Sequence, residues 1–143
     1  MENDIVLEVS GGTAEQPVGR TVLIDQDIID RLGGHVICAS FCKLIRLNKT
    51  INPLYFYYWM QFMYDTRIID RFQLQSTGII NFKFEYFLRK GTVVVPPKEL
   101  MDKFANTIKP FRDEKLLLAK KNEKLIAQKN LLLPRLMSGK LTV

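Results

Sequence analysis

Residues 111–133, with the sequence FRDEKLLLAKKNEKLIAQKNLLL, decide the fold because their apolar side chains recur at the spacing of a helix that pairs with another helix. With Phe111 at heptad position d, every d position holds a large apolar residue: Phe111, Leu118, Leu125 and Leu132. The a positions are Ile108, Lys115, Asn122, Lys129 and Leu136, and Ala119, Ile126 and Leu133 add an apolar row at e. A straight helix over residues 98–133 is about 50 Å long, too long to bury this stripe against a small domain. We therefore expect a second helix to cover it.

The lysines at a positions indicate the direction of that second helix. A parallel self-pair sets Lys115 against Lys115 and Lys129 against Lys129 in the seam, where the like charges repel each other. In an antiparallel pair, each lysine stem lies along a leucine and its ammonium group reaches water. The sequence therefore favours an antiparallel partner.

Prolines divide the rest of the tail. Pro96-Pro97 ends the preceding segment, and the helical period begins at Lys98, which predicts a domain over 1–97 and a pairing helix over 98–143. Pro110 and Pro134 each remove a backbone hydrogen bond, and Gly139 is a plausible helix terminator. We therefore expect the long helix to be kinked and segmented.

Residues 1–97 alternate between strand-like and helix-like segments, which predicts an α+β fold with a mixed sheet. Two β-branched runs, 5–9 and 18–24, predict strands joined by a turn-forming stretch over 10–17. The apolar run 36–47 predicts a third strand that is buried on both faces. Asn52 and Pro53 are a typical cap and first-turn residue for an aromatic-rich helix over 54–65, which we expect to be buried all round.

The last part of residues 1–97 is less regular. Residues 73–78 predict a polar turn, and residues 79–88 mix helical and alternating spacing and remain ambiguous. Residues 92–95 are β-branched and predict a short strand before the two prolines.

The net charge of +6 lies wholly in the tail. Residues 98–143 hold eleven Lys and Arg against five Asp and Glu, whereas residues 1–97 hold ten of each class. A basic helix attracts DNA phosphates through counterion release, but the same charges also occur on the solvated face of a paired helix. Charge alone leaves both interpretations open.

The sequence favours a cytoplasmic, non-catalytic protein. It contains no run of eighteen uncharged apolar residues and no basic, apolar start, so we expect neither a membrane span nor a signal peptide. Cys38 and Cys42 lie four residues apart in a predicted strand, a spacing that suits free thiols in a reducing cytosol. With His35 they make only three potential ligands in an apolar strand, which favours packing over a metal site. A single histidine excludes histidine-based triads, no carboxylate pair stands out, and we expect no cofactor.

Two segments have both a structural and a nucleic-acid interpretation. The loop 12–21 lacks the glycine–lysine spacing of a phosphate-binding P-loop, so it is either a flexible connection or a loop that contacts DNA. Gln16 and Arg20 are the residues there that can hydrogen-bond base edges or phosphates. The aromatic residues 55–59 and Phe62 can stack on single-stranded bases, but on a helix they surround the axis, which favours core packing.

Several motifs resemble the specificity subunit of type I restriction-modification systems. Residues 4–7, followed by Ser10-Gly11-Gly12 and Gly19-Arg20, resemble the middle of its target recognition domain. Residues 51–58, INPLYFYY, are similar to the start of a helix in that domain, and the segments 80–82 and 94–97 to its end. The tail LLPRLMSGKL, residues 132–141, is the most specific match. Since that domain usually has several dozen residues before the segment that matches Asp4, the resemblance implies an N-terminally truncated domain over 1–97.

The resemblance implies a protein without chemistry of its own. Family members read a split target in double-stranded DNA and bridge methyltransferase and restriction subunits, and two long spacer helices pair antiparallel in a full-length member. A chain with one such helix would pair with a second copy or with another specificity chain. The alternative is a helical assembly protein, a shortened specificity subunit that does not itself bind DNA.

The candidate DNA-binding residues are polar, basic or small residues on the predicted loops and strand ends. They are Ser10, Gly11, Gly12, Thr13, Gln16, Arg20, Lys43, Arg46, Ser76, Thr77, Asn81 and Lys83. The candidate pairing residues are the a and d positions given above together with Ile126.

Overall fold

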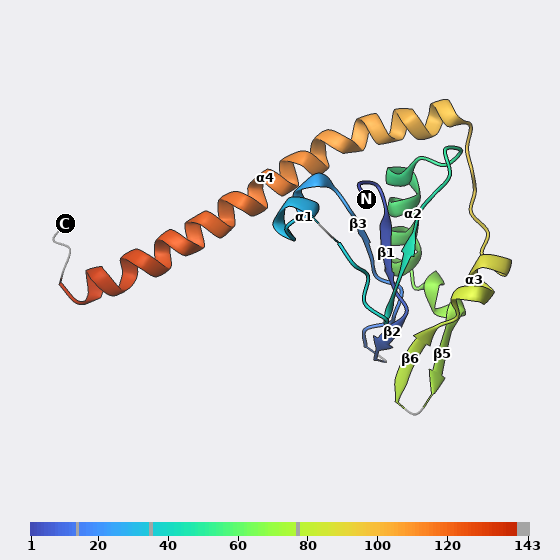
Figure 1. The fold of residues 1–143 in the computed structure, drawn as a ribbon, viewed down its shortest axis with the longest axis horizontal. Coiled ribbons are helices and arrows are strands. Elements are labelled where there is room, and N and C mark those ends of the chain that lie inside the picture. Colours follow the sequence, from blue (N-terminus) through green and yellow to red (C-terminus); the bar gives the residue numbers. More distant parts are fainter. Residues whose placement is uncertain (14, 35, 77, 140–143) are drawn as a thin grey trace. The chain divides into compact units, whose positions relative to one another are not determined.

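The computed structural model describes residues 1–13, 15–34, 36–76 and 78–139. The chain divides into two compact units, unit 1 over Met1–Ala105 and unit 2 over Asn106–Val143. Among its described residues, unit 1 contains two small antiparallel sheets and several short helices, and the long helix α4 (Lys98–Met137) begins in it (Figure 1). The α+β class is confirmed, but the single mixed sheet is wrong, because the described strands form two three-stranded sheets in which every pairing is antiparallel.

The first sheet has the strand order β3-β1-β4. Its strands are β1 (Ile5–Glu8), β3 (Thr21–Leu23) and β4 (Cys42–Ile45). Ile5 and Leu7 are completely buried, while Val6 and Glu8 are only partly buried. This alternation puts one face of the sheet into the core and leaves the other at the surface.

The second sheet has the order β2-β6-β5, with β2 (Ser10–Gly12), β5 (Gln73–Ser76) and β6 (Ile79–Phe82). Val9 connects the two sheets, because its N–H donates to Phe41 O (2.8 Å) and its carbonyl accepts from Phe82 N (2.8 Å). Both β2 and β5 lie in stretches that the sequence predicts as turns, so those two predictions are wrong. Small and polar side chains do not prevent an edge strand, since backbone groups make the ladder.

In the part of unit 1 that the structure describes, three α-helices and a short 3₁₀-helix precede α4. Helix α2 (Pro53–Asp65) begins as predicted, with Asn52 as its cap and Pro53 in its first turn. Helix α1 (Gln26–Arg31), which Asp25 caps, and the 3₁₀-helix η1 (Ile68–Phe72) were not predicted from the sequence. The ambiguous segment 79–88 contains both β6 and the start of α3 (Phe84–Lys90).

The core of unit 1 lies between α2, the buried face of the first sheet and an aromatic cluster. Phe56, Met60 and Met63 are the buried residues of α2, whereas Phe62 is exposed, so the prediction of a helix buried all round is wrong. Phe72, Phe82 and Phe87 contact one another, with ring centroids 5.1–6.2 Å apart. A remaining buried set closes the core: Ile5, Leu7, Val18, Leu23, Ile69 and Ile80.

Two further strand predictions are corrected. The predicted buried strand over 36–47 is reduced to β4, and Ile37 is 93% exposed, so this run is not a two-sided core strand. Residues 92–95 form no strand; their backbone is irregular, and Val94 and Val95 are exposed. Apolar composition alone did not distinguish a core strand from a surface segment, because burial depends on partners that are distant in sequence.

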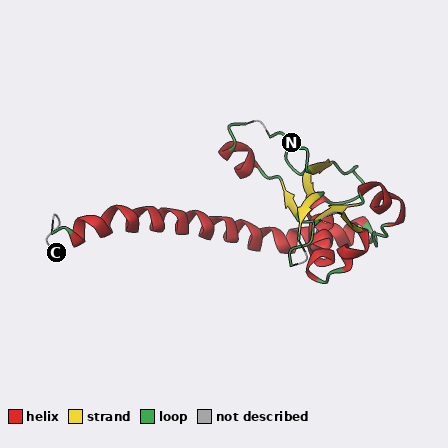
Figure 2. Ribbon diagram, turned by 90° about the horizontal axis from the view of Figure 1, so that it is seen from below, coloured by secondary structure: helices red, strands yellow, loops and turns green. Residues whose placement is uncertain are grey.

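Helix α4 (Lys98–Met137) begins at the predicted residue and contains both Pro110 and Pro134. Figure 2 shows it as one helix, so the prediction of separate segments is wrong. A proline within a helix costs one hydrogen bond and some strain, but the rest of a long helix can hold it in place. Met101, in the part of α4 that belongs to unit 1, is buried.

Candidate nucleic-acid interface and pairing helix

The two sheets bring one group of candidate DNA-binding residues together. Ser10 on β2 is paired with Asn81 on β6, and the Ser10 hydroxyl donates to Asn81 Oδ1 at 2.7 Å. The loop after β2 and the β5–β6 hairpin therefore extend from one sheet (Figure 1). This neighbourhood of residues 71 positions apart was not predictable from local sequence signals.

The loop after β2 has its own hydrogen bonds. Thr13 N donates to Gln16 O at 2.8 Å, and Gln16 N donates to the Thr13 hydroxyl at 3.1 Å. The side chains of Thr13 and Gln16 are exposed. Gly11 is exposed with φ 111°, while Gly12 is buried, and a Cβ there would lie 2.7 Å from Val18 N. Gly12 thus permits a close approach of two backbone segments, and Thr13 and Gln16 are the polar groups that this loop presents.

Arg20 is engaged by a carboxylate. Its guanidinium donates to Glu8 through Nε (2.9 Å) and Nη2 (2.5 Å), and these hydrogen bonds raise the pKa of Arg20. Glu8 is the last residue of β1, and Arg20 directly precedes the neighbouring strand β3; Glu8 N donates to Arg20 O. The positive charge of Arg20, a candidate DNA contact, is therefore balanced within the protein, although a guanidinium has further N–H groups that can bind phosphate.

Arg46 is engaged in the same way by Asp4. Nε and Nη2 of Arg46 both donate to the Asp4 carboxylate at 2.7 Å, and the N-terminal ammonium group of Met1 donates to it at 2.7 Å. The Asp4 side chain is 2% exposed, and the Arg46 side chain is 55% exposed. The hydrogen bonds from Arg46 lower the pKa of Asp4 from 3.8 to about 2, against the opposing effect of burial.

The two ion pairs lie at opposite ends of the outer face of the first sheet. Between them, Val6 on β1 is the cross-strand neighbour of both Val22 on β3 and Leu44 on β4, which are exposed. This face therefore has an apolar centre and one arginine–carboxylate pair at each end. The arginines were predicted as candidate contacts, but their partners Asp4 and Glu8 were not, although their alternation with the apolar residues Ile5 and Leu7 was an available signal.

The remaining described candidates lie in strands or directly after one. Lys43 on β4 is exposed, and Lys83, just after β6, is exposed with Nζ 5.9 Å from the centre of the Tyr86 ring. Ser76 is in β5, and Thr77 lies outside the described residues. Lys83 and Asn81 thus share the second sheet with Ser10, whereas Lys43 and Arg46 belong to the first.

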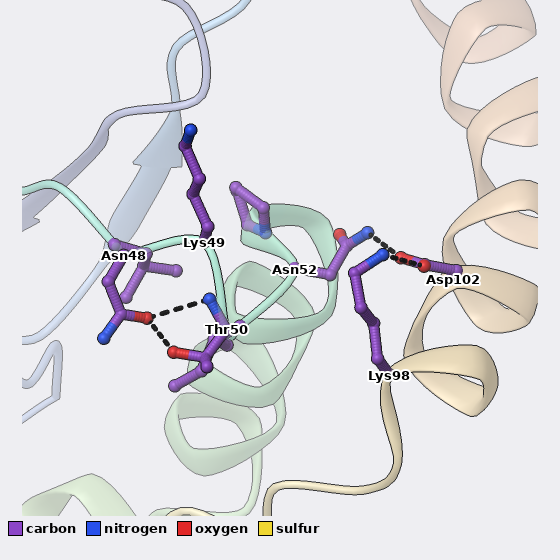
Figure 3. Close-up of a pocket in the computed structure, with 9 residues that line it drawn as sticks. Asn48, Lys49, Thr50, Asn52, Lys98 and Asp102 are labelled. Carbon is purple, nitrogen blue, oxygen red and sulfur yellow. Dashed lines mark hydrogen bonds and ion pairs between the residues drawn. The ribbon is translucent and has the colours of Figure 1, made fainter.

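A pocket of about 340 Å³ lies at the beginning of α2 (Figure 3). Asn52 Oδ1 accepts from Leu54 N (3.0 Å) and Tyr55 N (3.4 Å), while its Nδ2 donates to Asp102 Oδ1 (3.1 Å). Lys98 Nζ donates to Asp102 Oδ2 at 2.8 Å, and this hydrogen bond lowers the pKa of Asp102. Asn52 therefore caps α2 and joins it to the first turn of α4 within unit 1. The pocket is lined by Leu47, Asn48, Lys49, Thr50, Ile51, Asn52, Pro53, Lys98 and Asp102.

Both cysteines are free thiols, and burial, with a smaller contribution from Cys38, raises the pKa of Cys42. Among the described residues, no group of three or more His, Cys, Asp or Glu side chains is arranged to hold a metal ion, and His35 lies outside them. No helix in the described ranges has the length and apolar character to cross a membrane.

In unit 2, the apolar side of α4 is exposed. Phe111 is 70% exposed, and Leu118, Leu125, Ile126, Leu132, Leu133 and Leu136 are each at least 45% exposed. Lys115, Asn122 and Lys129 are exposed at the intervening a positions, and Ile108 is partly buried. We call the a and d residues from Phe111 to Leu136, together with Ala119, Ile126 and Leu133 at e, the α4 stripe. An exposed row of large apolar side chains of this length is typical of a protein–protein contact.

Comparisons of this sequence and structure with family models, curated proteins and solved structures gave no match.

Proposed function

We propose that the chain is the DNA-recognition and scaffold component of a type I restriction-modification complex, whose specificity subunit its sequence resembles. In this proposal unit 1 binds double-stranded DNA, and the chain docks methyltransferase and nuclease subunits, which carry out the catalysis. The α4 stripe pairs with an antiparallel helix from a second copy or another specificity chain. The observation that carries the proposal is the exposed α4 stripe, since a spacer helix must present such a surface to a partner.

The candidate DNA contacts fall into two groups of different character. Gln16, Asn81 and Lys83 belong to the second sheet and its loop, with hydrogen-bonding groups and one positive charge suited to base edges and phosphates. Arg20 and Arg46 each have a carboxylate partner, so they contact phosphate only through the N–H groups that the carboxylates do not use. We therefore expect the second-sheet group to contribute most of the sequence readout.

The test is a fluorescence-anisotropy titration of duplexes with randomised sequences, at several salt concentrations, with and without the methyltransferase subunit. Sequence-dependent binding that weakens with salt is expected. Absence of such binding in every condition would refute the DNA-recognition role.

Two variants at one ion pair test the role of Arg20. Arg20→Ala is expected to weaken duplex binding, whereas Glu8→Gln releases the guanidinium and is expected to strengthen it. Arg67→Ala is the matched control, because Arg67 also forms a surface ion pair, with Asp70 at 2.8 Å, and carries the same charge. If all three variants change the affinity equally, Arg20 makes no specific contact with the DNA.

A second function, helical assembly without DNA binding, is favoured by the charge balance of unit 1. Residues 1–97 carry no net charge, and Arg20 and Arg46 are both neutralised by carboxylates. This alternative predicts normal association through α4 and no difference between duplex sequences in the titration.

A further inference from the structure

We infer that the α4 stripe is self-complementary in one antiparallel register, in which Lys115, Asn122, Lys129 and Leu136 face Leu132, Leu125, Leu118 and Phe111 of the partner subunit. This inference rests on the pairing proposed above and commits it to a second copy of the chain. It concerns residues 111–136 of unit 2 alone. The overlap is about 38 Å long at 1.5 Å per residue.

The core layers support this register. Each polar a residue meets a large apolar d residue of the second copy, so the lysine stems lie along leucine and their ammonium groups reach water. The apolar e row continues the contact, because Ala119 faces the partner's Ile126. Pro110 and Pro134 occupy positions c and f, on the side of the helix away from the seam.

Charge complementarity selects the register from its neighbours. In an antiparallel pair the g residues flank the seam, and this register sets Glu114 beside the partner's Arg135, twice by symmetry. A shift of one heptad in one direction places Lys121 beside the partner's Lys121. The opposite shift places Lys121 beside the partner's Arg135. Of these three registers, only the inferred one places oppositely charged g residues beside each other.

Asn122 also favours the inferred register over its neighbours. The two-fold axis passes between residues 123 and 124, so the two copies of Asn122 lie about 4.5 Å apart along the axis. Their amide groups can donate and accept hydrogen bonds with each other, which satisfies both polar groups inside the seam. A buried Asn at an a position is known to specify register at a cost in stability.

Charge reversal tests the flanking contact. Within α4, the residues three and four positions away from Glu114 and from Arg135 are uncharged. Reversing the charge of either residue therefore breaks no ion pair between neighbouring turns of the same helix. Glu114→Arg and Arg135→Glu are each expected to weaken the dimer roughly tenfold in sedimentation equilibrium at low salt. The double variant is expected to return to within about threefold of the original. Lys124→Glu, at the outward c position, is the control and leaves the dimer unchanged.

Disulfide trapping tests the register directly. In a background with Cys38→Ser and Cys42→Ser, chains with Lys129→Cys are mixed with chains that carry Leu118→Cys, Phe111→Cys or Leu125→Cys, and then oxidised. Rapid cross-linking is expected with Leu118→Cys only, because the other two pairs belong to registers one heptad away. Lys129→Cys chains alone are expected to cross-link slowly, since the two cysteines are about 16 Å apart along the axis.

The outcomes separate this inference from the proposed function. A monomer at high protein concentration, self-linking of Lys129→Cys chains as fast as their linking to Leu118→Cys chains, or a double charge variant as weak as the singles each overturns the inferred register. Duplex binding is measured separately. A correctly registered dimer that binds no DNA refutes only DNA recognition, and a monomer that binds DNA in a sequence-dependent manner refutes only the self-pairing.

Discussion

Replacement of Asp4 by Asn removes a buried charge that three hydrogen bonds hold in place. Arg46 donates twice and the Met1 amino group once, each at 2.7 Å, to a carboxylate that is 2% exposed. Each tenfold change in an acid dissociation constant corresponds to about 1.4 kcal/mol at 25 °C. The fall in the pKa of Asp4 from 3.8 to about 2 therefore corresponds to about 2 kcal/mol of stability at pH 7.

The sign of the pH dependence follows from the lowered pKa. The ionised carboxylate stabilises the folded state fully above pH 3.8, and this contribution is lost as the pH falls from 3.8 to about 2. Asp4→Asn is therefore expected to lower the free energy of unfolding by about 2 kcal/mol at pH 7. Its difference from the original protein should shrink to near zero at about pH 2.

Urea unfolding followed by the fluorescence of Trp59, the single tryptophan, measures this difference. Trp59 lies in unit 1, next to Phe56 and Phe87, so it reports on this unit. Glu2→Gln, which removes an exposed carboxylate two residues away, is the control and should change stability by less than about 0.5 kcal/mol. If Asp4→Asn costs no more than Glu2→Gln, or if the difference is the same at pH 7 and pH 2.5, the reasoning is refuted.

Three further predictions concern unit 1. Gly19→Ala is expected to lower the free energy of unfolding in urea by about 2–3 kcal/mol, because Gly19 has φ 111° and a Cβ would lie 2.7 Å from Cγ1 of buried Ile69. Gly33→Ala is the control: Gly33 also has a positive φ but open space around it, so the loss should be about 1 kcal/mol. Asn52→Ala is expected to cost about 1–2 kcal/mol in the same assay by removing the cap of α2 and the hydrogen bond to Asp102, and Asn52→Ser should recover most of the cap; equal losses would contradict the capping role. Because burial raises the pKa of the Cys42 thiol, its alkylation by iodoacetamide at pH 8 should be slower than that of glutathione and should accelerate in urea; a rate equal to glutathione's in the folded protein would be the contrary result.

Local signals predicted where two of the helices begin. The heptad spacing after Lys98 and the Asn52-Pro53 pair each act within a few residues, and α4 and α2 begin at the predicted places. The prolines misled the prediction of segments, because Pro110 and Pro134 break single hydrogen bonds in a helix of 40 residues whose other bonds hold it together. Periodicity also predicted the apolar stripe on α4, but spacing alone does not show whether such a stripe is covered.

The strands and the charges needed the tertiary structure. Ser10–Gly12 and Gln73–Ser76 consist mostly of small or polar residues and predict turns, yet both pair with β6, because backbone hydrogen bonds with a distant segment outweigh weak strand propensity. The ion partners of Arg20 and Arg46 also depend on the tertiary structure. The sequence gives no sign of a partner for either arginine, whereas the fold places them beside Glu8 and Asp4. Spacing along one helix is a local property that the amino-acid order alone determined. The ion partners, separated by 12 and 42 residues, were decided by strand register, which only the folded sheet provides.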